Sequence, residues 1–152
     1  MKRNYQSFFL RGLLIFLLVS ACAWNASAQS SGQSLYKRLG GYDAIAAVTD
    51  DFISRLASDK QLSRFFVGLS TDSQKRLRQL VVDQLCEATG GPCIYIGRSM
   101  KTSHAGLGIT EGDWQITVNH LVATLDKFKV PEKEKSELLA IASSLKGDIV
   151  QK

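Results

Sequence analysis

Apolar side chains recur every three to four residues through four long segments of the chain after residue 40. This spacing places them on one face of an α-helix, whereas a half-buried strand would alternate at every second position. The apolar positions, segment by segment, are Ala44, Ala47, Val48, Phe52 and Leu56; Leu77, Leu80, Val81 and Leu85; Trp114, Val118, Leu121, Val122 and Leu125; and Leu138, Ile141, Ala142, Leu145 and Ile149. The apolar triplet at residues 94–96 is too short to carry a sheet. The sequence therefore predicts an all-α domain with four substantial helices.

Polar residues and glycines mark the expected ends of these helices. The expected N-terminal caps or first residues are, in chain order, Asp43, Ser70 or Thr71, Thr110 and Pro131. Gly90-Gly91-Pro92 is typical of a helix end, because glycine tolerates the left-handed conformation there and proline cannot continue the helix. Acidic residues follow Thr110 and Pro131 within one turn, where the helix dipole favours them.

The first 28 residues have the organisation of a secretory signal: a basic start, an apolar run over residues 13–19 and then small residues. The run is far shorter than the roughly 20 residues of a membrane span. Ala26-Ser27-Ala28 fits cleavage by signal peptidase after residue 28. Val19-Ser20-Ala21-Cys22 fits a lipoprotein signal, which would end at residue 21 and leave Cys22 acylated. The two remain open, with an uncleaved anchor as a third alternative, and all three predict an exported domain in a bacterial periplasm.

The predicted organisation after the signal is a short leader over residues 29–33 and one domain over residues 34–152. The chain carries a formal charge of +5 from 19 basic and 14 acidic residues. Three basic residues and no acidic one lie in the first 28, so the remainder has 16 basic and 14 acidic residues, or +2. A nearly neutral domain is not an electrostatic binder of nucleic acid. We expect membrane contact only through a lipid anchor at Cys22.

Cys86 and Cys93 bracket a segment that turns back on itself at Gly90-Gly91-Pro92. An oxidising compartment permits a disulfide between them. The alternative is a pair of free, redox-active thiols, but nothing in the neighbouring sequence would activate either one. We favour the structural bridge.

His104 lies in a glycine-rich stretch, Pro92–Ile109, that is long for a loop in a compact domain and therefore suggests a function. One interpretation is that His104 is a partly exposed loop residue without a ligand. A closed zinc site needs four ligands, and the only other histidine is His120, which lies beside an apolar helix face. A lone histidine among apolar residues suits haem, because the porphyrin supplies four nitrogens and leaves an axial position to the protein.

Several motifs together resemble a known family. They are Leu35-Tyr36-Lys37-Arg38-Leu39-Gly40-Gly41, Asp50-Asp51-Phe52, Leu62-Ser63-Arg64-Phe65-Phe66, Gly90-Gly91-Pro92 and the run from Tyr95 to Ile109, in which Met100 precedes His104 by four residues. From Ser34 to Val150 the chain resembles a group I truncated haemoglobin. The resemblance implies the truncated globin fold, a two-over-two helical sandwich around haem b, and it accounts for the long loop as the shortened region that presents the iron ligand.

The resemblance also implies roles for individual residues. His104 matches the proximal ligand of the haem iron. The implied pocket residues are Phe52, Ile53, Phe66, Leu77 and Val81 on the distal side and Met100, Leu107, Ile109, Trp114 and Val118 on the proximal and rear sides. Arg98 and Lys101 are expected to meet the haem propionates. Tyr95 is expected either to reach a propionate or to serve as a packing residue.

The distal pocket departs from the family pattern. Many members carry Phe-Tyr where this chain has Phe52-Ile53, and the tyrosine hydroxyl then points at the bound gas. Leu77 and Val81 are also apolar, although a shift in helix register would bring a glutamine (Gln74, Gln79 or Gln84) into the pocket. We therefore predict faster O₂ dissociation and autoxidation than in tyrosine-bearing relatives, with CO and NO held comparatively well.

Two classes of function follow from the resemblance. The first is reversible binding of O₂, NO or CO by a non-enzymatic haem protein. The second is NO dioxygenation or a peroxidase-like reaction, which would need an external reductase, because no flavin- or nicotinamide-binding segment is present in the sequence. An apolar pocket favours the first. A helical interaction module without a cofactor remains only if the resemblance misleads.

Overall fold

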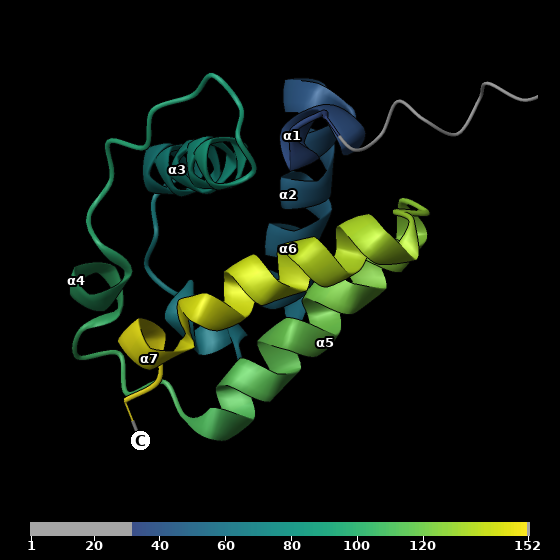
Figure 1. Ribbon diagram of the computed structural model, residues 1–152. Helices are drawn as coiled ribbons and strands as arrows, with labels where there is room; N and C mark the ends of the chain where they lie inside the picture. The colour runs from purple at the N-terminus through teal and green to yellow at the C-terminus, as the bar shows by residue number, and fades with distance from the viewer. Residues whose placement is uncertain (1–31, 152) are drawn as a thin grey trace, which may run out of the picture. The chain divides into compact units, whose positions relative to one another are not determined.

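The computed structural model describes residues 32–151, and one compact unit of the chain begins at Ser34. The predicted signal over residues 1–28, its two alternative cleavage sites and Cys22 lie outside the described residues. Figure 1 shows helices joined by loops, and no strand occurs among residues 32–151. The all-α prediction is confirmed.

The described helices range from three to eighteen residues. In chain order they are α1 (Leu35–Arg38), α2 (Gly41–Ser58), the 3-10 helix η1 (Ser63–Phe65), α3 (Thr71–Ala88), α4 (Met100–His104), α5 (Glu111–Lys127), α6 (Glu132–Ser144) and α7 (Lys146–Ile149). The four long ones, α2, α3, α5 and α6, occupy the segments expected from the periodicity. Among the described residues, none of these helices combines the length and apolar character that crossing a membrane requires.

Two of the expected caps form side-chain hydrogen bonds. The Ser70 hydroxyl accepts from the backbone N–H of Ser73 at 3.2 Å, which begins α3 as predicted. Thr110 and Asp113 form a reciprocal capping box at the start of α5. The expectation that Asp43 caps the first long helix was wrong. Gly40 adopts a left-handed φ of 97° and is itself the cap, so α2 begins three residues earlier and Asp43 lies in its first turn.

The last segment also differs from the prediction in its length. The apolar spacing continues to Ile149, but the helix is interrupted at Leu145 and resumes as α7. Leu145 keeps helical dihedral angles, and its N–H donates to the carbonyls of Ala142 and Ser143. This tighter last turn redirects the chain while keeping the same residues apolar, which is why periodicity alone does not reveal the break.

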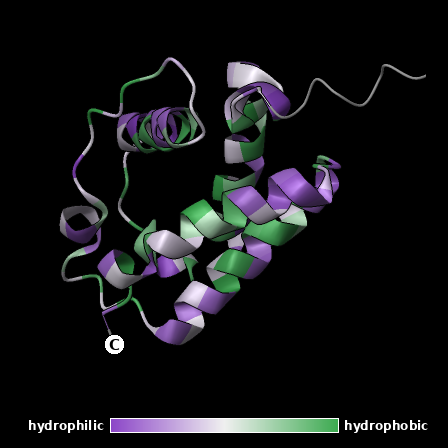
Figure 2. Cartoon of the chain, viewed as in Figure 1, coloured by the Kyte–Doolittle hydropathy of each residue, from purple (hydrophilic) through white to green (hydrophobic). Residues whose placement is uncertain are grey.

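Packing around α2 organises the two pairs of long helices. The first core cluster joins α2 to α3 through Ile45, Ala46, Val82 and Cys86, and the second joins α5 to α6 through Leu121, Leu125 and Leu138, with Val48 and Phe52 of α2 packed against it. Figure 2 shows apolar stretches on all four helices, interrupted by polar residues. Because α2 contributes to both clusters, it holds the α2–α3 pair against the α5–α6 pair in the two-over-two arrangement.

A half-buried carboxylate, Asp51, ties α2 to α5. It accepts hydrogen bonds from Arg55 Nε at 2.6 Å and from Thr124 Oγ1 at 3.0 Å, and it is also bonded to Lys127 Nζ. The hydrogen bonds from Arg55 and Lys127 outweigh the effect of burial and lower the pKa of Asp51 from 3.8 to about 2. The ionised carboxylate therefore stabilises the folded state.

We expect the free energy of unfolding of Asp51→Asn to depend less on pH in acid than that of the wild type. The folded-state pKa lies below the unfolded one, so the stabilisation is complete above pH 3.8 and is lost as the pH falls to about 2. The free energy of unfolding, measured by urea denaturation at several pH values, should fall less steeply in this window for the variant. Asp72→Asn, which changes a side chain that is 96% exposed, is the control. Equal slopes for wild type and Asp51→Asn would contradict the assignment.

Candidate cofactor site around His104

The short helix α4 ends at His104 and selects the tautomer of its neutral imidazole. The Ser99 hydroxyl caps α4 by accepting from the N–H of Thr102 at 3.2 Å. One turn further on, His104 Nδ1 lies 2.8 Å from the carbonyl oxygen of Met100. A carbonyl can only accept, so Nδ1 must carry the proton and donate. The neutral ring therefore keeps its lone pair on Nε2, the arrangement in which a histidine binds a metal.

A cavity of about 420 Å³ lies between α3 and the segment that leads into α4. Its lining residues are Arg76 and Leu80 of α3, Tyr95, Ile96, Gly97 and Arg98 of the loop, and Ser103 of α4, the neighbour of His104. This volume lies within the range of about 300–1,000 Å³ that ligand pockets occupy. A second void, enclosed by apolar residues of α2, α3, α5 and α6, has only about 20 Å³ and holds no cofactor.

Two guanidinium groups line the cavity without a carboxylate partner among residues 32–151. Arg76 and Arg98 are both exposed, and neither forms an ion pair there. By contrast, the neighbouring Arg78 is held by Asp50 of α2 through bonds of 2.7 and 2.9 Å. Unpaired cations at the edge of a half-apolar cavity favour a ligand that carries negative groups at one end.

The loop that carries Arg98 is braced by Tyr95. The Tyr95 hydroxyl donates to the carbonyl of Arg98 at 2.7 Å. The phenol ring lies directly against Gly97, where an added Cβ would come within 2.3 Å of the ring. Tyr95 therefore packs within its own loop, and its ring leaves no room for a side chain at position 97.

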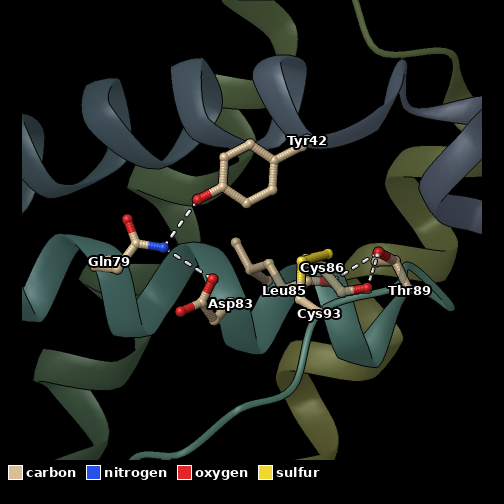
Figure 3. The surroundings of a disulfide bond; sticks show 7 residues. All are labelled: Tyr42, Gln79, Asp83, Leu85, Cys86, Thr89 and Cys93. Carbon is tan, nitrogen blue, oxygen red and sulfur yellow. Dashed lines mark hydrogen bonds between the residues drawn. A yellow bond between two sulfur atoms is a disulfide. The ribbon is translucent and has the colours of Figure 1, made fainter.

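A disulfide between Cys86 and Cys93 anchors the other end of this loop to α3. The two Cα atoms are 5.7 Å apart, as the structural bridge requires. Figure 3 shows the bridge beside Thr89, whose hydroxyl donates to the carbonyls of Leu85 and Cys86. Gly91 passes so close that an added Cβ would lie 2.7 Å from the Cys86 sulfur. The Gly90-Gly91 turn therefore leaves room for the disulfide as well as ending α3.

The chain can now be compared with known proteins. A family model described as bacterial-like globin matches residues 34–151. The chain belongs to this family. A group 1 truncated hemoglobin of Mycolicibacterium paratuberculosis is 36% identical over 116 residues, which make up 76% of this chain and 83% of that protein.

Solved structures agree with this assignment. The truncated hemoglobin of Tetrahymena pyriformis in its Fe(III) form superposes with a TM-score of 0.71 at 26% identity, covering 79% of this chain and 100% of that one. The 2/2 hemoglobin of Synechococcus sp. in the cyanomet state, with covalently attached heme, gives the same TM-score, identity and coverage. The fold of this globin is therefore that of the truncated 2/2 globins.

Two of the three glutamines of α3 hydrogen-bond to neighbouring groups of the protein. Gln79 donates to the Tyr42 hydroxyl of α2 at 2.8 Å and to Asp83 at 2.9 Å, as Figure 3 shows. Gln74 donates to the carbonyl of Leu69 at 3.0 Å. Both amides are thus engaged away from the cavity, and Gln84 is half-buried. Leu77 and Val81, also half-buried, lie four residues apart on one face of α3, and Leu80, three residues after Leu77, lines the cavity.

The other expected pocket residues differ in burial. Phe52, Ile53, Phe66, Met100, Trp114 and Val118 are half-buried, Ile109 is buried, Leu107 is 44% exposed and Lys101 is exposed. Phe52 packs against the α5–α6 cluster of the core. Of all the residues expected in the pocket, Tyr95 and Arg98 line the cavity itself.

Asp113 holds the Phe66 turn against the start of α5. This buried carboxylate accepts from Gln61 Nε2 and from the Arg64 guanidinium, both at 2.7 Å. Burial acts to raise its pKa, but hydrogen bonds from Gln61, Thr110 and Arg64 prevail and keep the pKa well below its usual range. The remaining histidine, His120, is bonded through Nε2 to Asp59 at 2.9 Å, so α5 contacts the residue that follows α2.

Sequence reasoning missed Arg76, Ile96 and Ser103 as parts of the cavity wall. A signal for Arg76 was present, since it lies four residues before Leu80 and so shares its helix face. Ile96 and Ser103 carried no comparable signal, because their positions depend on the path of an irregular loop.

We expect the disulfide to stabilise this globin measurably. Closing so short a loop, with a sequence separation of 7, restricts the unfolded chain and contributes about 2.5 kcal/mol. Reduction of the wild type, or the double change Cys86→Ala and Cys93→Ala, should lower the free energy of unfolding by about that amount in urea denaturation. Added reductant should leave the free energy of unfolding of the double variant unchanged. Equal stability of oxidised and reduced wild type would refute the prediction.

Proposed function

We propose that this globin binds haem b with His104 as the axial ligand and reversibly binds O₂, NO or CO. The observation that carries the proposal is the hydrogen bond from His104 Nδ1 to the Met100 carbonyl, which leaves Nε2 available to iron. Bound haem would supply an iron centre that coordinates diatomic gases, with its remaining chemistry set by the protein around it.

Two further features of the chain support this cofactor. Arg76 and Arg98 offer unpaired cations to the two propionates of haem, in place of the Arg98 and Lys101 pair expected from the sequence. Half-buried apolar side chains such as Leu77, Val81 and Trp114 leave apolar surface that a porphyrin would cover.

The apolar distal face favours reversible binding over oxidative catalysis. Ile53, Leu77 and Val81 donate no hydrogen bond, and Gln74 and Gln79 are engaged elsewhere. An oxidation of NO or a peroxidase-like reaction would in addition need electrons from a separate reductase. We therefore propose a gas-binding role without catalytic turnover.

We also propose that the protein is exported to the periplasm. The signal pattern of residues 1–28 supports this proposal, and so does the Cys86–Cys93 disulfide, since disulfides persist in oxidising compartments. Anchoring through a lipid at Cys22 belongs to the same proposal.

The first test is the absorbance spectrum of the purified protein with added haem. We expect a Soret band for the wild type and a pyridine haemochrome spectrum of haem b. Loss of an outer-shell partner alone weakens metal binding about 10- to 100-fold, so His104→Ala should raise haem loss to an acceptor globin by more than that. His120→Ala, which changes the histidine bonded to Asp59, should behave as the wild type. An unchanged spectrum in His104→Ala would overturn the assignment.

The second test adds a hydrogen-bond donor to the distal pocket. We expect Ile53→Tyr to slow O₂ dissociation about ten- to hundredfold, because a hydrogen bond to a strongly polar acceptor contributes about 1.5–3 kcal/mol. CO dissociation should change much less. Ile53→Phe adds the same ring without the hydroxyl and is the matched control. Flash photolysis and stopped-flow mixing measure both rates, and equal O₂ dissociation from the tyrosine and phenylalanine variants would contradict an apolar distal pocket.

A further inference from the structure

The side chain of Gln151, which follows α7, reaches back to the loop after His104. Its Nε2 donates to the carbonyl of His104 at 2.5 Å, and its Oε1 accepts from the N–H of Gly108 at 2.9 Å. Its backbone N–H donates to the carbonyl of Ile109, also at 2.9 Å. One residue thus forms three hydrogen bonds to the segment that joins α4 to α5.

The His104 carbonyl needs such a partner because α4 ends there. The last carbonyls of a helix have no acceptor role within it. Ala105 leaves the helix with extended dihedral angles, φ −56° and ψ 129°, so the N–H of Gly108, four residues on, bonds to Gln151 Oε1 and not to the His104 carbonyl as it would in a continuing helix. The carbonyl instead accepts from Leu107 N at 3.2 Å and from Gln151 Nε2.

These contacts hold His104 from two sides. On one side, the Met100 carbonyl orients the ring through Nδ1. On the other side, Gln151 binds the main chain of His104. Helix α7, which shortly precedes Gln151 in the chain, packs against α4. Ile109, the third point of attachment, is 8% exposed and directly precedes the capping box of α5. The orientation of the imidazole therefore depends on the C-terminal segment as well as on α4.

We infer that Gln151 is a positioning residue for the axial histidine, a latch that holds the main chain of His104 and so sets the direction of Nε2. The inference rests on the proposed haem binding. Gln151 touches neither the ring nor the cavity, and it acts only through His104 and the loop. Groups behind a metal ligand control its orientation and the strength of its bond to the metal.

The test compares Gln151→Ala with Gln151→Glu in the haem-loaded protein. The alanine variant loses both side-chain hydrogen bonds, whereas glutamate keeps an acceptor for Gly108 N–H and loses the donor to His104. Both variants should release haem to an acceptor globin about two- to tenfold faster, as the loss of one neutral hydrogen bond predicts. Both should also shift the iron–histidine stretching band in the resonance Raman spectrum of the ferrous protein, which a general loss of stability would not move.

Amide exchange in the haem-free protein gives an independent measurement. Exchange at Gly108 should accelerate in Gln151→Ala and stay closer to the wild type in Gln151→Glu, because only the glutamate can accept from Gly108. Gln115→Ala is the matched control, since Gln115 is an exposed glutamine that bonds only to Asn119 Oδ1, at 3.0 Å. This variant should leave haem release, the stretching band and Gly108 exchange unchanged.

Two results separate the latch from the proposed function. An unshifted iron–histidine band in both Gln151 variants, with haem release as in the wild type, would overturn the latch and leave haem binding intact. A wild-type chain that takes up no haem would overturn the proposed function, and that is seen before any variant of Gln151 is compared.

Discussion

The hydrogen bond between His104 Nδ1 and the Met100 carbonyl is the interaction on which the proposed chemistry depends. It joins the residue at the start of α4 to the residue at its end, so a helix of five residues suffices to define the tautomer. With Nδ1 donating to the carbonyl, the neutral ring has its lone pair on Nε2, the nitrogen that is left to coordinate a metal. The caps at Ser99 and Gln151 then hold the two ends of the short helix that carries this bond.

The rest of the fold keeps a cavity between α3 and the segment that leads into α4, with Ser103 in its wall. α2 shares a core cluster with α3 and packs against the α5–α6 cluster, while α4 packs against α7. The connecting loop is held by the disulfide at one end and by Tyr95 over Gly97 near the other. Arg76 and Arg98, one from each wall, supply positive charge where the cavity is polar. The site is thus built from elements that do not form a common core with each other.

Sequence patterns predicted the long helices well because their apolar faces and caps are local signals. Ser70 and Thr110 cap helices as expected, since each needs only a hydroxyl three residues before a free N–H. The same reasoning wrongly predicted a cap at Asp43, because Gly40 in a left-handed conformation already begins α2 before that position. The break at Leu145 also escaped prediction, because the residues on both sides keep one apolar periodicity.

By itself, the sequence determined the all-α class, the family resemblance and the choice of His104, since these follow from spacing and from the rarity of histidine in the chain. The tertiary structure alone decided which cations flank the cavity, that Tyr95 braces the loop, and that Gln79 turns toward Tyr42. It also joined Gln151 to His104 across 47 positions of sequence. Such contacts depend on how helices pack and where irregular loops run, and no local pattern of residue types encodes either.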